Sequence, residues 1–189
     1  MNVKVVLVDF YDSFTFNLAH YLEQLNAEVT VIRHDELKLN ELDQVDAIVL
    51  SPGPGLPTEK ENLLSLLTMF DTRKPILGVC LGMQAIGIHL GGSIENQQEV
   101  KHGVPANLKV EKIVQLFQDV PSSFSVGLYH SWKVVGIPPE WQTAQLENGV
   151  LMSIEVPERK LFGVQFHPES ILTENGLKIL SNFLKFVQS

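Results

Sequence analysis

The stretch Lys74–Gly87, with the sequence KPILGVCLGMQAIG, decides how the whole chain is expected to fold. Its apolar run, residues 76–79, follows a proline and predicts the last part of a buried strand. From Leu81 onward the apolar residues predict a helix, and Gly91-Gly92 marks its end. The one cysteine of the chain, Cys80, therefore lies at the junction between a strand and a helix.

Cys80 is flanked by Gly78 and Gly82, which is the pattern of a nucleophile elbow with cysteine in place of serine. The elbow residue has strained backbone geometry, so side chains on its near neighbours would clash. The following helix directs its N-terminus at the sulfur, which favours the thiolate. An isolated free cysteine is more often a small core residue. The two glycines and the strand-to-helix context favour a nucleophile instead.

Strand-like and helix-like segments alternate through the first 90 residues. This alternation predicts an α/β fold, a three-layer α/β/α sandwich with a mostly parallel central sheet of the flavodoxin-like kind. Asp12 and Ser13 are candidates to cap the first helix. The expected strands are residues 3–8, 29–32, 47–50 and 76–79, and the expected helices lie within 14–25 and 63–70.

Between Gly92 and Phe166 the pattern changes to short strand-like runs separated by turn signals such as Asn148-Gly149. These runs predict a small antiparallel β extension of the sheet, and a helix over residues 176–187 closes the chain. Because no linker interrupts the pattern, we expect residues 1–189 to form a single domain. The expected strands of the extension are residues 108–110, 125–128, 133–135, 151–154 and 162–166.

The bulk composition excludes several classes of partner. The formal charge is −8 with a pI near 5.2, and no cluster of Lys and Arg stands out, so neither nucleic acid nor an anionic membrane surface is an expected partner. A single cysteine cannot form an intrachain disulfide, which fits a reducing cytoplasm. The first apolar run is too short for a signal peptide, and no apolar stretch approaches membrane-spanning length.

A second informative stretch, Gly163–Ser170, has the sequence GVQFHPES. Val164 and Phe166 alternate like a strand, and Pro168 holds His167 in an extended conformation. In an extended chain residues i and i+2 face the same side, so Glu169 can reach the imidazole of His167. A carboxylate that orients a histidine, which in turn serves a nucleophile, is the generalised catalytic triad. On its own, a segment of this kind is equally compatible with a surface turn.

His167 is distant from Cys80 in sequence, so only the fold can bring them together. The carboxyl ends of strands in an open α/β sheet do meet around one crevice. Residues 51–55, SPGPG, also follow a strand, and their backbone N–H groups are candidates to form an oxyanion hole with the N–H of Leu81. Such a loop alone is more often only a turn. No spacing typical of a metal site is present.

Three ordered motifs together resemble the class I glutamine amidotransferases: Pro52–Gly55, Gly78–Gln84 and Gly163–Ser170. The resemblance covers essentially the whole chain and implies the fold of that family. Two further stretches, Asp12–Asn17 and Tyr129–Ser131, and the continuation of the last motif to Thr173 narrow the similarity. They are similar to the small subunit of anthranilate synthase or of 4-amino-4-deoxychorismate synthase.

The resemblance implies that Cys80 attacks the side-chain carboxamide of L-glutamine, that His167 moves the proton and that Glu169 orients His167. Glutamate would leave by way of a γ-glutamyl thioester, and ammonia would pass to a chorismate-binding large subunit, with no cofactor. The N–H groups of Gly55 and Leu81 would hold the oxyanion. By the same resemblance, the residues expected to bind glutamine are Gly53, Pro54, Gly55, Gln84, Ser131 and Trp132, and those near the partner interface are His102-Gly103 and residues 12–15.

The sequence departs from the family pattern at three positions. Phe10 replaces a usual Asn and Leu128 a usual Arg, and both changes are candidates to alter partner contacts. Trp132 replaces a usual Leu, which leaves a backbone contact to glutamine but puts a side-chain role in doubt.

Two other functions are compatible with parts of this pattern. A stand-alone γ-glutamyl peptidase or hydrolase would use the same Cys-His-Glu set without a partner. A non-catalytic flavodoxin-like module would use the sheet edge only to bind a ligand or partner. The absence of residues left over for a chorismate site favours a glutaminase subunit of anthranilate synthase, with aminodeoxychorismate synthase, or service to both enzymes, as the alternative.

Overall fold

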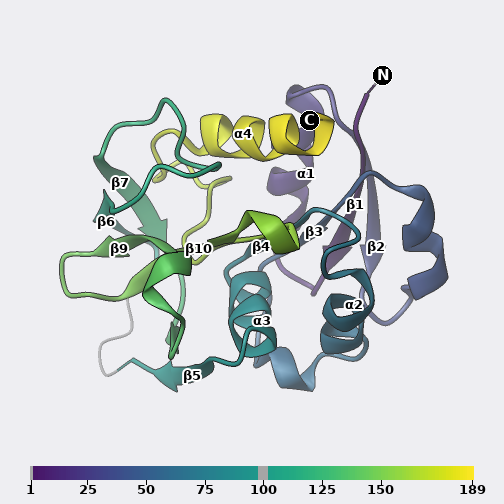
Figure 1. The fold of residues 1–189 in the computed structure, drawn as a ribbon, viewed down its shortest axis with the longest axis horizontal. Coiled ribbons are helices and arrows are strands. Elements are labelled where there is room, and N and C mark those ends of the chain that lie inside the picture. The colour runs from purple at the N-terminus through teal and green to yellow at the C-terminus, as the bar shows by residue number, and fades with distance from the viewer. Residues whose placement is uncertain (1, 98–101) are drawn as a thin grey trace.

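A nine-stranded sheet with helices on both faces forms the body of the computed structural model, which describes residues 2–97 and 102–189 (Figure 1). The strand order is β2-β1-β3-β4-β11-β10-β9-β6-β7, and β5 pairs with β8 in a separate sheet. The strands are β1 (Lys4–Asp9), β2 (Glu28–Arg33), β3 (Ala47–Leu50), β4 (Ile76–Val79), β5 (Ser93–Asn96), β6 (Val104–Val110), β7 (Ser123–Leu128), β8 (Trp132–Val135), β9 (Gln142–Leu146), β10 (Leu151–Val156) and β11 (Leu161–Val164). The helices are α1 (Thr15–Gln24), α2 (Leu63–Phe70), α3 (Leu81–His89) and α4 (Gly176–Gln188), with 3₁₀ turns at Leu39–Gln44, Pro57–Glu59, Pro139–Trp141 and Pro157–Arg159.

The predicted three-layer α/β/α arrangement is confirmed. Strands β2, β1, β3, β4 and β11 are parallel, and their side chains alternate between two apolar cores. On one face α1 and α4 bury Leu18 and Phe183 against Leu7 of β1. On the other face α2 and α3 bury Leu67 and Ile86 against strand residues of opposite orientation. Figure 1 shows the two helix pairs on opposite sides of the sheet.

The antiparallel extension has more strands than the sequence indicated. β10, β9, β6 and β7 continue the main sheet in antiparallel pairs beyond β11. Two strands were not predicted, β5 and β9, because their sequences SIEN and QTAQL are polar. β5 is mostly exposed, and it is defined by its pairing with β8 and not by burial of apolar side chains.

Two details of the sequence prediction were wrong. The last strand ends at Val164 and not at Phe166, because the chain bends away from the sheet after Val164. The first helix begins at Thr15 with Phe14 at its N-cap, so neither Asp12 nor Ser13 caps it. The Asp12 carboxylate instead accepts a hydrogen bond from the Phe14 N–H at 2.8 Å and stabilises the preceding turn. Within the part of the chain that the structure describes, no helix combines the length and apolarity needed to cross a membrane.

Candidate active site

Cys80 connects β4 to α3 in the strained conformation expected of a nucleophile elbow. Its φ is 52° and its ψ is −100°, which is rarely occupied by a residue with a side chain. A Cβ on Gly78 would collide with the backbone of Gly82, and a Cβ on Gly82 would lie 2.7 Å from the Cβ of Leu50. The two glycines therefore let the first turn of α3 fold tightly against β3 and β4.

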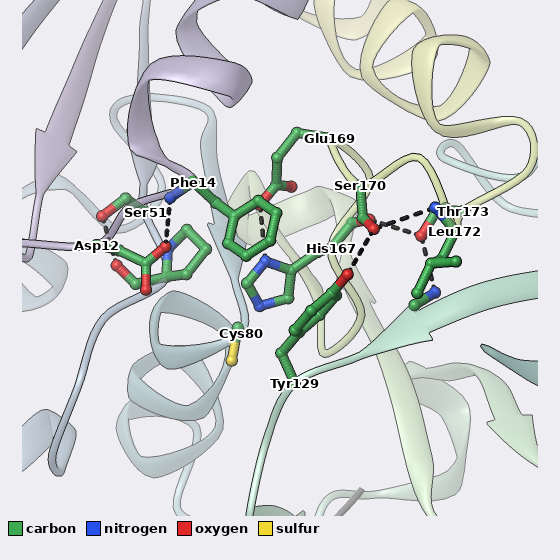
Figure 2. Close-up of polar contacts among 12 residues, drawn as sticks. Asp12, Phe14, Ser51, Cys80, Tyr129, His167, Glu169, Ser170, Leu172 and Thr173 are labelled. Atoms are coloured by element: carbon green, nitrogen blue, oxygen red, sulfur yellow. Dashed lines mark hydrogen bonds and ion pairs between the residues drawn. The ribbon is translucent and has the colours of Figure 1, made fainter. Parts of the chain in front are cut away.

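Strand register brings the two distant motifs to the same place. β11 lies beside β4 in parallel with Val164 opposite Val79, and the Cys80 N–H donates to the Val164 carbonyl at 2.8 Å. The residues that follow each strand therefore leave the sheet edge side by side. Figure 2 shows the imidazole of His167 between the Cys80 sulfur and the Glu169 carboxylate. The structure thus brings together the three residues that the sequence singled out as a triad.

His167 and Glu169 form a buried pair. The Nδ1 atom of His167 lies 2.7 Å from Oε1 of Glu169, and each residue is 2% exposed. This contact fixes Nδ1 as the donor to the carboxylate and leaves Nε2 to exchange protons. Although burial lowers the pKa of His167, hydrogen bonding and charge at Cys80 and Glu169 outweigh it and raise this pKa to about 10. An imidazolium beside a sulfur is the arrangement that activates cysteine nucleophiles.

Two amide side chains connect the cysteine to the neighbouring backbone. Gln165 Nε2 donates to the Cys80 Sγ at 3.5 Å, and Gln84 Nε2 donates to Gln165 Oε1 at 3.3 Å. Gln84, on the first turn of α3, also approaches the Trp132 carbonyl at 3.3 Å. The sequence analysis gave Gln165 no role, although its polar side chain between the apolar Val164 and Phe166 was a visible signal. Gln165 is fully buried, so its amide belongs to the site.

The Trp132 carbonyl also receives a hydrogen bond from His130. The two atoms, Nδ1 of His130 and the carbonyl oxygen, are 2.8 Å apart. Burial, together with the charge of His167, lowers the pKa of His130 to about 4, so this imidazole is neutral at physiological pH. Ser131, before β8, accepts the Gln97 N–H at 2.7 Å through its carbonyl. Ser131 and Trp132 thus adjoin the amide network through their backbone.

The loop after β3 packs against the start of α3. A Cβ on Gly53 would lie 2.9 Å from Cδ2 of Leu81, so this glycine allows the loop to approach the helix closely. Ser51 Oγ accepts the Phe10 N–H at 3.0 Å and ties the loop to the end of β1. Gly55 is exposed with φ of 77°, and Pro54 precedes it on the exposed part of the loop. Leu81 is the first residue of α3, where backbone N–H groups lack intrahelical acceptors.

The departures at Phe10 and Leu128 occupy buried positions. Phe10 is 0% exposed and stacks on His34 with ring centroids 5.3 Å apart, and Leu128 is 2% exposed. In this conformation neither side chain can touch a partner directly, so the expectation that they alter partner contacts finds no support at the surface. Trp132 is half-buried, and its carbonyl is the group that faces Gln84.

Comparison with known proteins identifies the family. The model of the glutamine amidotransferase class-I family matches residues 6–186, and the chain belongs to this family of enzymes. A Haemophilus influenzae protein named putative anthranilate synthase component II is 38% identical over 96% of this chain and 96% of its own length. Anthranilate synthase component 2 of Lactococcus lactis is 37% identical over 97% and 94%. An aminodeoxychorismate synthase of Streptomyces griseus is 41% identical over 96% of this chain and 26% of that protein.

Solved structures agree with the fold. The structure of a putative GMP synthase component from Thermoplasma acidophilum superimposes with a TM-score of 0.90, at 26% identity, over 100% of this chain and 95% of that one. A glutamine amidotransferase from Thermotoga maritima has a TM-score of 0.78 at 17% identity over the full length of both chains, which shows the shared fold.

Proposed function

We propose that this chain is the glutaminase subunit of anthranilate synthase. It hydrolyses L-glutamine to glutamate and ammonia and delivers the ammonia to a chorismate-using synthase subunit for tryptophan biosynthesis, in the cytoplasm, as one domain spanning residues 1–189. The observation that carries the proposal is the placement of the His167 imidazole between the Cys80 sulfur and the Glu169 carboxylate. The names of the Haemophilus and Lactococcus relatives support anthranilate synthase as the enzyme.

In the first half of the reaction, the Cys80 sulfur attacks the side-chain carbonyl carbon of glutamine. The N–H groups of Gly55 and Leu81 stabilise the oxyanion that forms. His167 then gives its Nε2 proton to the departing nitrogen, so that ammonia leaves and a γ-glutamyl thioester remains on Cys80. Glu169 keeps the imidazole oriented through Nδ1 and stabilises its positive charge.

In the second half, neutral His167 takes a proton from water, and the resulting hydroxide attacks the thioester carbonyl. Collapse of this second tetrahedral intermediate releases glutamate and restores the Cys80 thiolate beside the imidazolium. The residues that we propose to hold glutamine during both steps are Gly53, Pro54, Gly55, Gln84, Ser131 and Trp132. The closeness of Gln84 to the Trp132 carbonyl supports a shared role for these two residues.

A second candidate is the equivalent subunit of aminodeoxychorismate synthase in the folate pathway, or one subunit serving both enzymes. The Streptomyces griseus relative supports it, because its identity to this chain, 41%, is no lower than that of the anthranilate synthase relatives. The chemistry at Cys80 is the same for both candidates. They differ in the large subunit that captures the ammonia, so isolating that subunit from the native cell extract decides between them.

The test uses Cys80→Ser in the complex with the native large subunit. We expect loss of glutamine-dependent synthesis with retention of ammonia-dependent synthesis, because the sulfur is needed only to release ammonia. In the wild-type protein, the glutamine-analogue electrophile 6-diazo-5-oxo-L-norleucine should label Cys80 stoichiometrically.

Equal loss of both activities in a well-folded Cys80→Ser complex would contradict the proposal. The absence of labelling would favour a non-catalytic binding module. Efficient cleavage of γ-glutamyl peptides, indifferent to any large subunit, would favour a stand-alone hydrolase.

A further inference from the structure

Two aromatic rings flank the imidazole of His167. The Tyr129 ring centroid lies 4.7 Å from that of His167, and the Phe14 centroid lies 5.1 Å from it. The Phe14 and Tyr129 rings are themselves 4.9 Å apart, so the three rings form one cluster, the aromatic clamp. Figure 2 shows both rings beside the imidazole, with Phe14 entering from the turn before α1. Neither Phe14 nor Tyr129 belongs to the triad or to the residues proposed to hold glutamine.

Both rings are held in place by hydrogen bonds near them. The Tyr129 hydroxyl and the Ser170 Oγ are 2.9 Å apart, and Ser170 belongs to the same segment as His167. At Phe14, the backbone N–H donates to the Asp12 carboxylate at 2.8 Å. The His167 segment is fixed separately, because Thr173 Oγ1 donates to the His167 carbonyl at 2.6 Å. The clamp and the segment that carries the imidazole are thus anchored to different strands and helices.

The clamp also separates the imidazole from solvent. Phe14 and Tyr129 line a surface groove of about 680 Å³, while His167 behind them is 2% exposed. With water excluded, the hydrogen bond between Nδ1 and Glu169 is stronger than it would be in solution. The ring faces also attract a positively charged imidazole. A smaller side chain at either position would leave space in which the imidazole could rotate.

We propose that Phe14 and Tyr129 are positioning residues, which hold the imidazole of His167 in line between Cys80 and Glu169 and keep water from the bond between Nδ1 and the carboxylate. The inference rests on the proposed glutaminase function for its kinetic consequences. The hydrogen bond itself can be observed without any turnover.

The experiment compares Tyr129→Leu and Phe14→Leu with Tyr129→Phe, the conservative variant that keeps the ring. Glutamine hydrolysis by the complex with the native large subunit should show kcat lowered by about 10- to 100-fold in the two leucine variants, with KM nearly unchanged, because a misplaced catalytic group costs rate and not substrate affinity. Tyr129→Phe should recover most of the lost rate. Thermal unfolding of each variant controls for loss of the fold.

A second readout is the proton NMR signal of the His167 Nδ1–H, which is assigned by its disappearance in Glu169→Gln. A short buried hydrogen bond gives a sharp, strongly deshielded signal, and we expect exchange with water to broaden it in Tyr129→Leu and Phe14→Leu but not in Tyr129→Phe. An unchanged signal in folded leucine variants would overturn the clamp.

The two proposals fail in different ways. If the wild-type complex releases no ammonia from glutamine while the leucine variants broaden the signal, the glutaminase proposal fails and the clamp stands. If turnover is normal in both leucine variants, the clamp is wrong and the glutaminase proposal stands. Equal loss in Tyr129→Leu and Tyr129→Phe would assign the effect to the bond with Ser170 and would also refute a role for the ring.

Discussion

Gln165 offers the sharpest test of the polar environment of the cysteine, because its amide is the group that the structure places against the sulfur. Gln165→Met keeps the length and approximate volume of this fully buried side chain and removes its donor and acceptor. The Gln84 amide would retain the Trp132 carbonyl as an acceptor, so the variant leaves that donor partnered.

The expected cost follows from the charge that Cys80 carries during attack. A hydrogen bond to a charged group contributes about 1.5–3 kcal/mol. If the Gln165 amide stabilises the reacting sulfur by this amount, its removal slows labelling by 6-diazo-5-oxo-L-norleucine by about 10- to 150-fold. The loss of neutral hydrogen bonding should lower the free energy of unfolding by only about 1 kcal/mol.

The assay is the second-order rate constant for labelling of Cys80, measured with the Tm of each variant. Gln118→Met is the matched control, since it makes the same chemical change at an exposed residue whose amide donates to the Val114 carbonyl. A labelling rate for Gln165→Met equal to that of the control would refute the assignment of this amide to the reacting sulfur.

Three further predictions concern the triad and the elbow. Glu169→Gln should reduce glutamine turnover by about 10³- to 10⁴-fold and lower the pKa of His167 in NMR titration, and a pKa still near 10 would count against the carboxylate. Gly82→Ala should lower the free energy of unfolding by about 1–3 kcal/mol in urea denaturation, because the added Cβ meets Leu50, and wild-type stability would contradict this packing. Because folding raises the pKa of His167 from 6.5 to about 10, its contribution to stability is complete below pH 6.5 and declines as pH rises toward 10. The difference in unfolding free energy between wild type and His167→Asn should therefore shrink over that range, and a difference that grows would reverse the assigned shift.

The parallel half of the sheet could be predicted from the sequence because its strands are buried on both faces. Residues 47–50 and 76–79 match β3 and β4 without error, since continuous apolar runs have no other common explanation at that length. The antiparallel half was predicted less well. β9, with the sequence QTAQL, depends on cross-strand pairing with β6 and β10, and such pairing has little signature in one strand alone.

The candidate site shows the same division. That Cys80 and His167 meet was predictable, because both follow strands whose carboxyl ends share one edge. The contact of Gln165 with the sulfur and the packing of Phe14 and Tyr129 on the imidazole were not. These depend on the direction that each side chain takes after the backbone leaves the sheet, and sequence spacing does not specify it.

The register between β4 and β11 has a consequence for how the gene can change. Since Val79 and Val164 are paired, the sheet itself measures the separation of nucleophile and base, independently of what lies between them. Lengthening or shortening the excursion through residues 92–150 should be tolerated wherever it spares the groups that touch the site. Deleting a single residue inside β4 or β11 should silence the enzyme even if the protein still folds.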